Sequence, residues 1–118
     1  MKAQHDLSAA QLLLAREELA DVVCFHAQQT AEKALKAALV VAGKQPLRTH
    51  DLPRLLDELA GEDERWEEIR LVCEALSDFA VSPRYPEWEL TAPDADATGA
   101  VRNAELVLEF MLKTTGMA

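Results

Sequence analysis

Apolar residues run through almost the whole of residues 21–43, and a polar band crosses the middle of this segment. At the 100° per residue of an α-helix, most of the apolar side chains fall on one broad arc. The members of this arc are Val23, Ala27, Ala31, Ala34, Leu35, Ala38 and Val41. The opposite arc carries Gln29, Glu32, Lys33 and Lys36, with His26 near its edge. The pattern predicts a central helix that is buried on more than one side and holds a band of polar groups at mid-length.

A first helix is expected before this segment, over residues 6–20, with Asp6 or Ser8 as its cap. Its inner stripe would consist of Leu7, Ala10, Leu13 and Leu14. Asp21 would cap the central helix, and Gly43 would end it in a left-handed turn. A small break at Asp21 would instead give one kinked rod. We favour two helices.

Pro53 fixes the start of a third helix. With Asp51 as the cap, Pro53 lies in the first turn, where a proline costs little; with Thr49 as the cap, its ring would meet a carbonyl. Gly61 would end this helix. Its buried face would be Leu52, Leu55, Leu56 and Leu59.

Asp63 would cap a fourth helix, and a long connection follows it. The apolar stripe of the fourth helix is Trp66, Ile69, Val72, Cys73, Leu76, Phe79 and Ala80. The connection contains Pro83, Pro86 and Pro93, which exclude regular helix. A connection of this length is long for a compact bundle, and such loops often carry function or contact a partner.

The last helix is expected to open at residues 91–94, where Thr-Ala-Pro-Asp resembles a capping box. Its seam is Ala97, Ala100, Val101, Ala104, Val107, Leu108, Met111 and Leu112. The chain has no alternation of strand period and no repeat. The sequence therefore predicts an all-α fold, an up-and-down bundle of four to five helices, with residues 1–118 forming one domain.

The formal net charge of −9 argues against a broad basic surface for nucleic acid. Contact with RNA would therefore depend on a few Arg or Lys residues at particular positions. Cys24 and Cys73 lie on predicted apolar faces without metal-ligand spacing. We therefore expect reduced core thiols, no metal or cofactor, and a cytoplasmic protein. No apolar run approaches the ~18 residues of a membrane span, which predicts no membrane association.

Two interpretations of the polar band remain open. Glu32 and Lys36 stand four apart in the favourable order, so an ion pair on a solvated face, or a dimer contact, explains the band without a ligand. Alternatively Gln29, Glu32 and Lys33 contribute to a ligand or partner site. His26 is interpreted as a packing or surface residue.

His50 and Arg84 are the other candidates. His50 precedes the third helix, so it would either fix the loop by capping or a hydrogen bond, or contribute to a modest anion site. Arg84 stands between Pro83 and Tyr85 and offers a planar fork to a phosphate or a carboxylate. The alternative is an internal ion pair, for example with Glu32. Tyr85 would border the site or anchor the loop.

Classical enzyme motifs are absent: the sequence has no Gly-rich phosphate loop, no paired metal ligands and no nucleophile elbow. Three strings do resemble one family in combination. They are H-A-Q-Q-T-A-E-K-A-L-K at residues 26–36, T-H-D-L at residues 49–52 and S-P-R-Y-P at residues 82–86. In order and spacing, over about the whole chain, they resemble the HEPN domain.

The resemblance implies a small up-and-down helical bundle, commonly a homodimer, associated with binding of nucleotides or RNA. Many prokaryotic members are similar to toxins, or to partner subunits of a minimal nucleotidyltransferase. The motif positions that carry over are Gln29, Glu32, Lys33, His50, Arg84 and Tyr85. We take these six as candidate ligand-binding residues.

Ribonuclease members of the family carry an Arg followed after four to six residues by a His, and this chain departs from that pattern. Its histidines are His5, His26 and His50, and no Arg precedes any of them at that spacing. We therefore expect a non-catalytic module that binds a nucleotide or pairs with a nucleotidyltransferase, as in a toxin–antitoxin pair. The alternatives are a metal-independent endoribonuclease that uses Arg84 with a nearby histidine, and a dimeric scaffold without a ligand.

Overall fold

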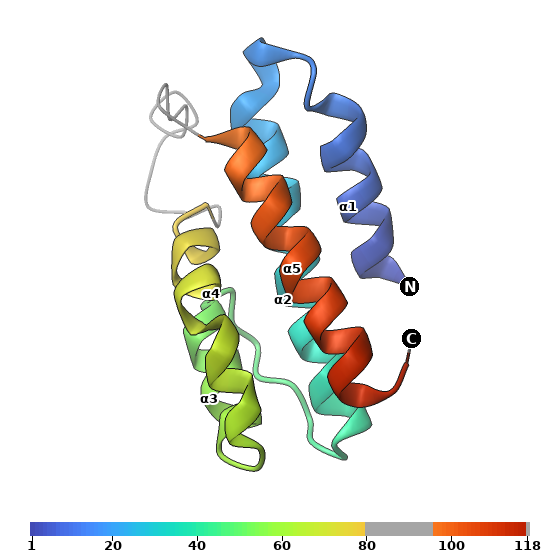
Figure 1. The fold of residues 1–118 in the computed structure, drawn as a ribbon, viewed down its shortest axis with the longest axis vertical. Helices are drawn as coiled ribbons and strands as arrows, with labels where there is room; N and C mark the ends of the chain where they lie inside the picture. The colour runs from blue at the N-terminus through green and yellow to red at the C-terminus, as the bar shows by residue number, and fades with distance from the viewer. Residues whose placement is uncertain (80–95, 118) are drawn as a thin grey trace.

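The computed structural model describes residues 1–79 and 96–117, and every regular element in these ranges is a helix. The five α-helices are α1 (Lys2–Leu13), α2 (Ala20–Val41), α3 (Leu52–Ala60), α4 (Arg70–Ser77) and α5 (Ala97–Thr115). Two short 3-10 segments, η1 (Glu17–Leu19) and η2 (Glu64–Ile69), precede α2 and α4. The predicted all-α, up-and-down bundle is confirmed (Figure 1).

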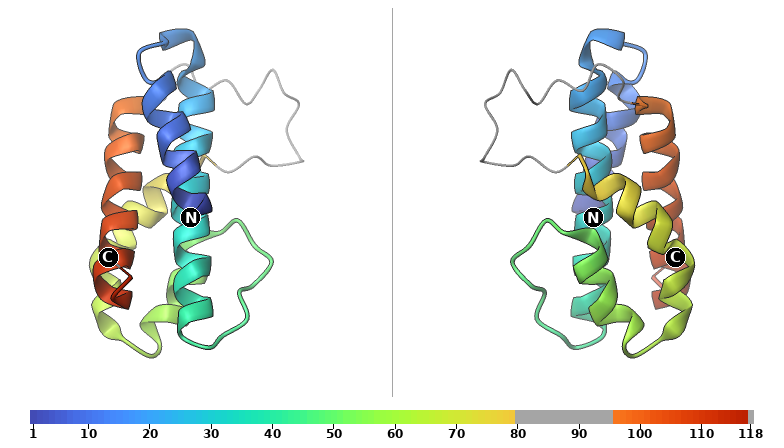
Figure 2. Two further views of the ribbon diagram at one scale, coloured as in Figure 1. Left: turned by 90° about the vertical axis from the view of Figure 1, so that its right-hand side faces the viewer. Right: turned by 90° about the vertical axis from the view of Figure 1, so that its left-hand side faces the viewer.

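Helices α2 and α5 form the centre of the bundle (Figure 1). Helix α1 packs along one side of this pair, and the hairpin of α3, η2 and α4 packs along the other (Figure 1). The two side views show α1 beside the first half of α2, and the hairpin beside its second half (Figure 2). The middle of α2 therefore lies between the part of the helix that packs against α1 and the part that packs against the hairpin.

Small side chains explain the close packing of the two central helices. The predicted inner row Ala27, Ala31, Ala34 and Ala38 of α2 is at most 1% exposed. Helix α5 contributes two further buried alanines, Ala100 and Ala104. Since an alanine projects only a methyl group, ridges of one helix can enter the grooves of the other at short range. Larger side chains fill the space toward the hairpin, and these are Leu35, Leu39, Leu52, Leu55, Leu56, Ile69, Leu76 and Met111.

The helix ends after α2 follow the predicted local chemistry. Gly43 has a φ of 79°, the left-handed turn expected after α2. Asp51 accepts a hydrogen bond from the backbone N–H of Arg54 and places Pro53 in the first turn of α3. Helix α3 ends at Gly61, as predicted.

The first half of the chain differs from prediction at its boundaries. Helix α1 begins at Lys2 rather than Asp6 and ends at Leu13, so neither Asp6 nor Ser8 is a cap. Segment η1 separates it from α2, which confirms two helices instead of one kinked rod. Helix α2 starts after Leu19, and Asp21 lies in its first turn instead of capping it. Helix α1 starts earlier because Met1 and Gln4 cap it, with the terminal amino group donating to Oε1 of Gln4 at 3.0 Å. The side chain of Asp6 makes long-range ion pairs instead, which a local capping pattern does not reveal.

Further expectations need correction or stay open. Asp63 caps as predicted, but the turn that follows is the 3-10 segment η2, and the α-helix starts only at Arg70. Val41, placed on the inner arc, is 54% exposed because it is the last residue of α2. Asp96 accepts from the backbone N–H of Gly99 at 2.8 Å and caps α5. The expected opening at residues 91–94, the three prolines of the connection and Ala80 lie outside the described residues.

Across the described ranges, no helix combines the length and the apolar character needed to cross a lipid bilayer.

Candidate functional site

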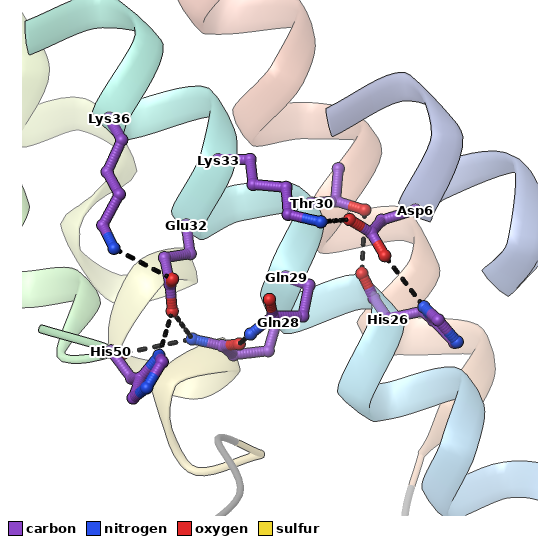
Figure 3. A network of polar contacts seen from close by, with 9 residues as sticks. All are labelled: Asp6, His26, Gln28, Gln29, Thr30, Glu32, Lys33, Lys36 and His50. Carbon is purple, nitrogen blue, oxygen red and sulfur yellow. Dashed lines mark hydrogen bonds and ion pairs between the residues drawn. The ribbon is translucent and has the colours of Figure 1, made fainter. Parts of the chain in front are cut away.

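A buried carboxylate, Glu32, is the centre of the polar band on α2. Its side chain is 7% exposed, and its two oxygens bind three partners (Figure 3). Nδ1 of His50 lies 2.7 Å from Oε1, and Nζ of Lys36 donates to Oε2 at 3.1 Å. The amide of Gln28 also donates to Oε1, at 3.3 Å. One carboxylate thus connects the middle of α2 to His50, which directly precedes the cap of α3.

Gln28 completes this network from a fully buried position. Its Nε2 donates both to Glu32 and, at 3.1 Å, to the backbone carbonyl of His50. Its own carbonyl oxygen accepts from Nε2 of Gln29 at 2.8 Å. The loop before α3 is therefore held at His50 by side chain and backbone together. This confirms the interpretation of His50 as a residue that fixes the loop through a hydrogen bond.

A second cluster lies on the opposite side of α2 and involves α1 (Figure 3). Asp6 of α1 has a side chain only 12% exposed. It forms an ion pair with Lys33, and its Oδ1 lies 2.9 Å from Nδ1 of His26. Thr30 donates to the backbone carbonyl of His26 at 2.9 Å. This cluster is the polar connection between α1 and α2.

Both acidic groups are ionised at neutral pH. Burial by itself would raise the pKa of Glu32, but hydrogen bonds from His50, Lys36 and Gln28 outweigh it and lower the pKa. The same balance holds for Asp6, where burial is outweighed by the bonds from Lys33 and His26, so its pKa is also lowered. The two carboxylates therefore act as acceptors only, and the histidine nitrogens that face them must donate.

A hollow in the described surface lies away from both clusters, between the end of α2, the α3–η2 corner and the end of α5. Its lining includes Ala38, Leu59 and Trp66. The acidic side chains in its lining, Glu62 and Asp63, already pair with Lys44 at 3.4 Å and with Arg65 at 2.7 Å. The acidic groups of the hollow are therefore already paired within the chain, so we take the polar network of α2 as the candidate site for a charged ligand.

Comparison with known proteins identifies the family of the chain. Residues 1–114 match the HEPN domain over nearly the whole chain. The chain belongs to the HEPN family. A protein of Methanocaldococcus jannaschii named "Putative toxin MJ1304" is 34% identical over 125 aligned residues, which cover 93% of this HEPN chain and 81% of that protein. No solved structure matches the chain.

The HEPN motif residues divide between the two clusters. Gln29, Glu32 and His50 lie in the network around Glu32, whereas Lys33 pairs with Asp6 on the other side of α2. Arg84 and Tyr85 lie outside the described residues. The predicted pair of Glu32 and Lys36 is confirmed, but the carboxylate is buried and not part of a solvated face.

Two residues of these polar clusters were not predicted from the sequence. Gln28 was not singled out, although its place four residues before Glu32 puts the two side chains on one face of the helix. Asp6 was interpreted as a local cap, and its partners stand 20 and 27 residues away. The spacing to Glu32 could have identified Gln28. No short-range pattern could have identified the partners of Asp6.

Proposed function

We propose that this chain is the HEPN member of a toxin–antitoxin-like pair, and that it binds a nucleotide or a partner nucleotidyltransferase without catalysing a reaction. Two comparisons support the proposal: the HEPN match over residues 1–114, and a relative whose name describes a toxin. The absence of the Arg-and-His ribonuclease spacing supports the non-catalytic part.

The observation that best supports a ligand site is that His50 and Lys36 each bind one of the two oxygens of the buried Glu32 carboxylate. The carboxylate holds an imidazole and an ammonium group in place at the surface, with 66% and 29% of the two side chains exposed. Their remaining N–H groups can donate to a phosphate, because each pairing with Glu32 uses only part of the donor capacity. Lys33, which pairs with Asp6 in the second cluster, lies one turn from Lys36 along α2 and is also partly exposed.

We further propose that Arg84 and Tyr85 complete this site, with Arg84 contacting phosphate and Tyr85 bordering the ligand. Isothermal calorimetry with ATP, GTP and short RNA oligonucleotides tests the proposal. Arg84→Ala and His50→Ala should each weaken binding about tenfold or more, since a hydrogen bond to a charged group contributes roughly 1.5–3 kcal/mol. Lys113→Ala is the matched control, because Lys113 forms an exposed pair with Glu109 on α5. Failure of all these ligands to bind would rule out the ligand part.

The partner part needs a separate experiment. Co-expression with a minimal nucleotidyltransferase, the class of partner that the proposal names, should give a complex that co-purifies. Lys33→Glu should weaken that complex if the polar band of α2 faces the partner, and sedimentation of the variant alone tests the expected homodimer. Co-purification unchanged by Lys33→Glu would place the partner on another face.

A metal-independent endoribonuclease is the second candidate, and the Glu32–His50 pair favours it. A histidine with one ring nitrogen held by a carboxylate is the usual arrangement of a general acid–base residue. Arg84 would stabilise the phosphate. Incubation of the purified protein with labelled RNA tests this: cleavage no faster than that by an Arg84→Ala, His50→Ala double variant would exclude it.

A further inference from the structure

The three histidines of the chain have different surroundings. His50 combines a hydrogen bond to a buried carboxylate with a side chain that is 66% exposed. His26 also bonds a carboxylate, that of Asp6, but its side chain is only 29% exposed. His5 lies on the exposed surface of α1 and bonds no carboxylate within the described residues. Of the three, only His50 has a ring that is both oriented by a carboxylate and largely exposed.

The contact with Glu32 also determines which nitrogen of His50 carries the proton. Since Glu32 is ionised and can only accept, Nδ1 of His50 must be the donor in their 2.7 Å contact. In the neutral ring the second nitrogen, Nε2, then holds a lone pair. Nε2 lies at the ring edge turned away from Glu32, and it bonds no other group in residues 1–79 and 96–117 (Figure 3).

A neutral imidazole with an exposed lone pair is a nucleophile, and its surroundings here would favour attack on phosphorus. Positive charge develops on the ring when Nε2 forms a bond, and the adjacent carboxylate stabilises that charge. Lys36 binds the other oxygen of the same carboxylate and is partly exposed, so its ammonium group is available to phosphoryl oxygens.

We propose that Nε2 of His50 is a phosphoryl-acceptor site that takes its group from a phosphoramidate or acyl-phosphate donor. With phosphoramidate, the lone pair of Nε2 forms the new N–P bond while the P–N bond of the donor breaks. The electron pair of that bond leaves with the nitrogen, which is already protonated in the zwitterionic form of the donor and is therefore released as neutral ammonia without a further proton. The Nδ1 proton stays hydrogen-bonded to Glu32. The site does not require the chain to bind a nucleotide.

The direct test is incubation of the full chain with phosphoramidate at mildly alkaline pH, followed by mass spectrometry of its peptides. The protein contains its own controls: His5 tests exposure without a carboxylate, and His26 tests a carboxylate with less exposure. Phosphorylation of His50 ahead of both others is expected. Modification of His5 as fast as His50, or no modification of His50, would overturn the proposal.

A pair of variants tests the role of the carboxylate. Glu32→Gln should slow modification of His50 about tenfold, the usual effect of losing a group that orients a functional histidine. Asp6→Asn removes the equivalent carboxylate from His26 and should leave the rate at His50 unchanged. Nitrogen NMR of the wild-type protein provides a test that needs no variant. The spectrum should show the proton of neutral His50 on Nδ1. A proton on Nε2 of the neutral ring would contradict the proposal.

Discussion

Glu32 and Glu109 each pair with a lysine four residues later, at 3.1 Å and 2.9 Å, and burial is what distinguishes the two pairs. The Glu32 side chain is 7% exposed, whereas those of Glu109 and Lys113 are both more than 60% exposed. An exposed pair of this kind contributes only a few tenths of a kcal/mol. A buried carboxylate, by contrast, supports every donor that surrounds it, and loss of the carboxylate leaves those donors without an acceptor.

Glu32→Ala should therefore lower the free energy of unfolding far more than Glu109→Ala. We expect a loss of about 2 kcal/mol for Glu32→Ala, below the largest values for broken buried pairs because Lys36 and His50 can turn to water. For Glu109→Ala we expect less than about 0.5 kcal/mol. Urea unfolding of both variants measures the difference. Equal losses would mean that the network around Glu32 adds no more than a surface pair.

Between elements, Asp6 connects α1 to α2 through Lys33 and His26, and this contact should make stability depend on acid pH. Burial opposes ionisation of Asp6, but its hydrogen bonds prevail and hold its pKa below the ordinary value of 3.8. A carboxyl group with a lowered pKa stabilises the fold above its unfolded-state pKa, and this stabilisation is lost as pH falls through the folded-state pKa.

Asp6→Asn should consequently be less stable than wild type at neutral pH. The difference in the free energy of unfolding should begin to narrow as pH falls below the ordinary pKa of 3.8, where the unfolded carboxyl takes up its proton, and should be lost as pH falls through the lower folded-state pKa. Unfolding free energies of both proteins across the acid range provide the measurement. A gap that stays constant throughout that range would contradict the lowered pKa of Asp6.

The helix ends allow a matched pair of glycine substitutions. Gly43 has a φ of 79°, a left-handed conformation that costs other residues about 1 kcal/mol, so Gly43→Ala should destabilise the fold by about that amount. Gly61 ends α3 with a φ of −61°, and an added methyl group would meet only ordinary contacts at 3.4 Å. Gly61→Ala should be neutral or slightly stabilising. Thermal unfolding of both variants distinguishes them, and equal shifts would contradict the reasoning.

Features that depend on neighbouring residues could be predicted from the sequence, whereas contacts between residues far apart in the chain could not. Periodicity predicted the buried faces of α2, α3 and α5, and glycine or capping chemistry predicted the ends at Gly43, Asp51 and Gly61, since these depend on neighbouring residues. The role of Asp6 depends on residues far along the chain and was missed, as was the start of α1, which the local pair Met1 and Gln4 sets. Of the polar network at the candidate site, the motif indicated Glu32 and His50, but not Gln28, which joins them.

At the scale of the whole molecule, the two cysteines report on whether the bundle unfolds as one unit. Cys24 lies in α2 and Cys73 in α4, both are free, and both belong to one core that includes side chains from all five α-helices. Burial, the largest cause, raises the pKa of Cys24 to about 11 and that of Cys73 to about 12. Neither thiol should therefore react in the native protein, because the thiolate is the reactive form.

We propose that the chain is one domain, and thiol labelling under increasing urea tests this. Because both cysteines belong to the same core, exposing either one requires that core to open. A single domain of this size should then expose both thiols in one cooperative transition, at the same urea concentration as the loss of helical circular dichroism. The variants Cys24→Ser and Cys73→Ser assign each signal to one thiol. Separate midpoints for Cys24 and Cys73 would mean that the α3–α4 hairpin opens independently of α2, and that the site between them at Glu32 and His50 is the boundary between two units.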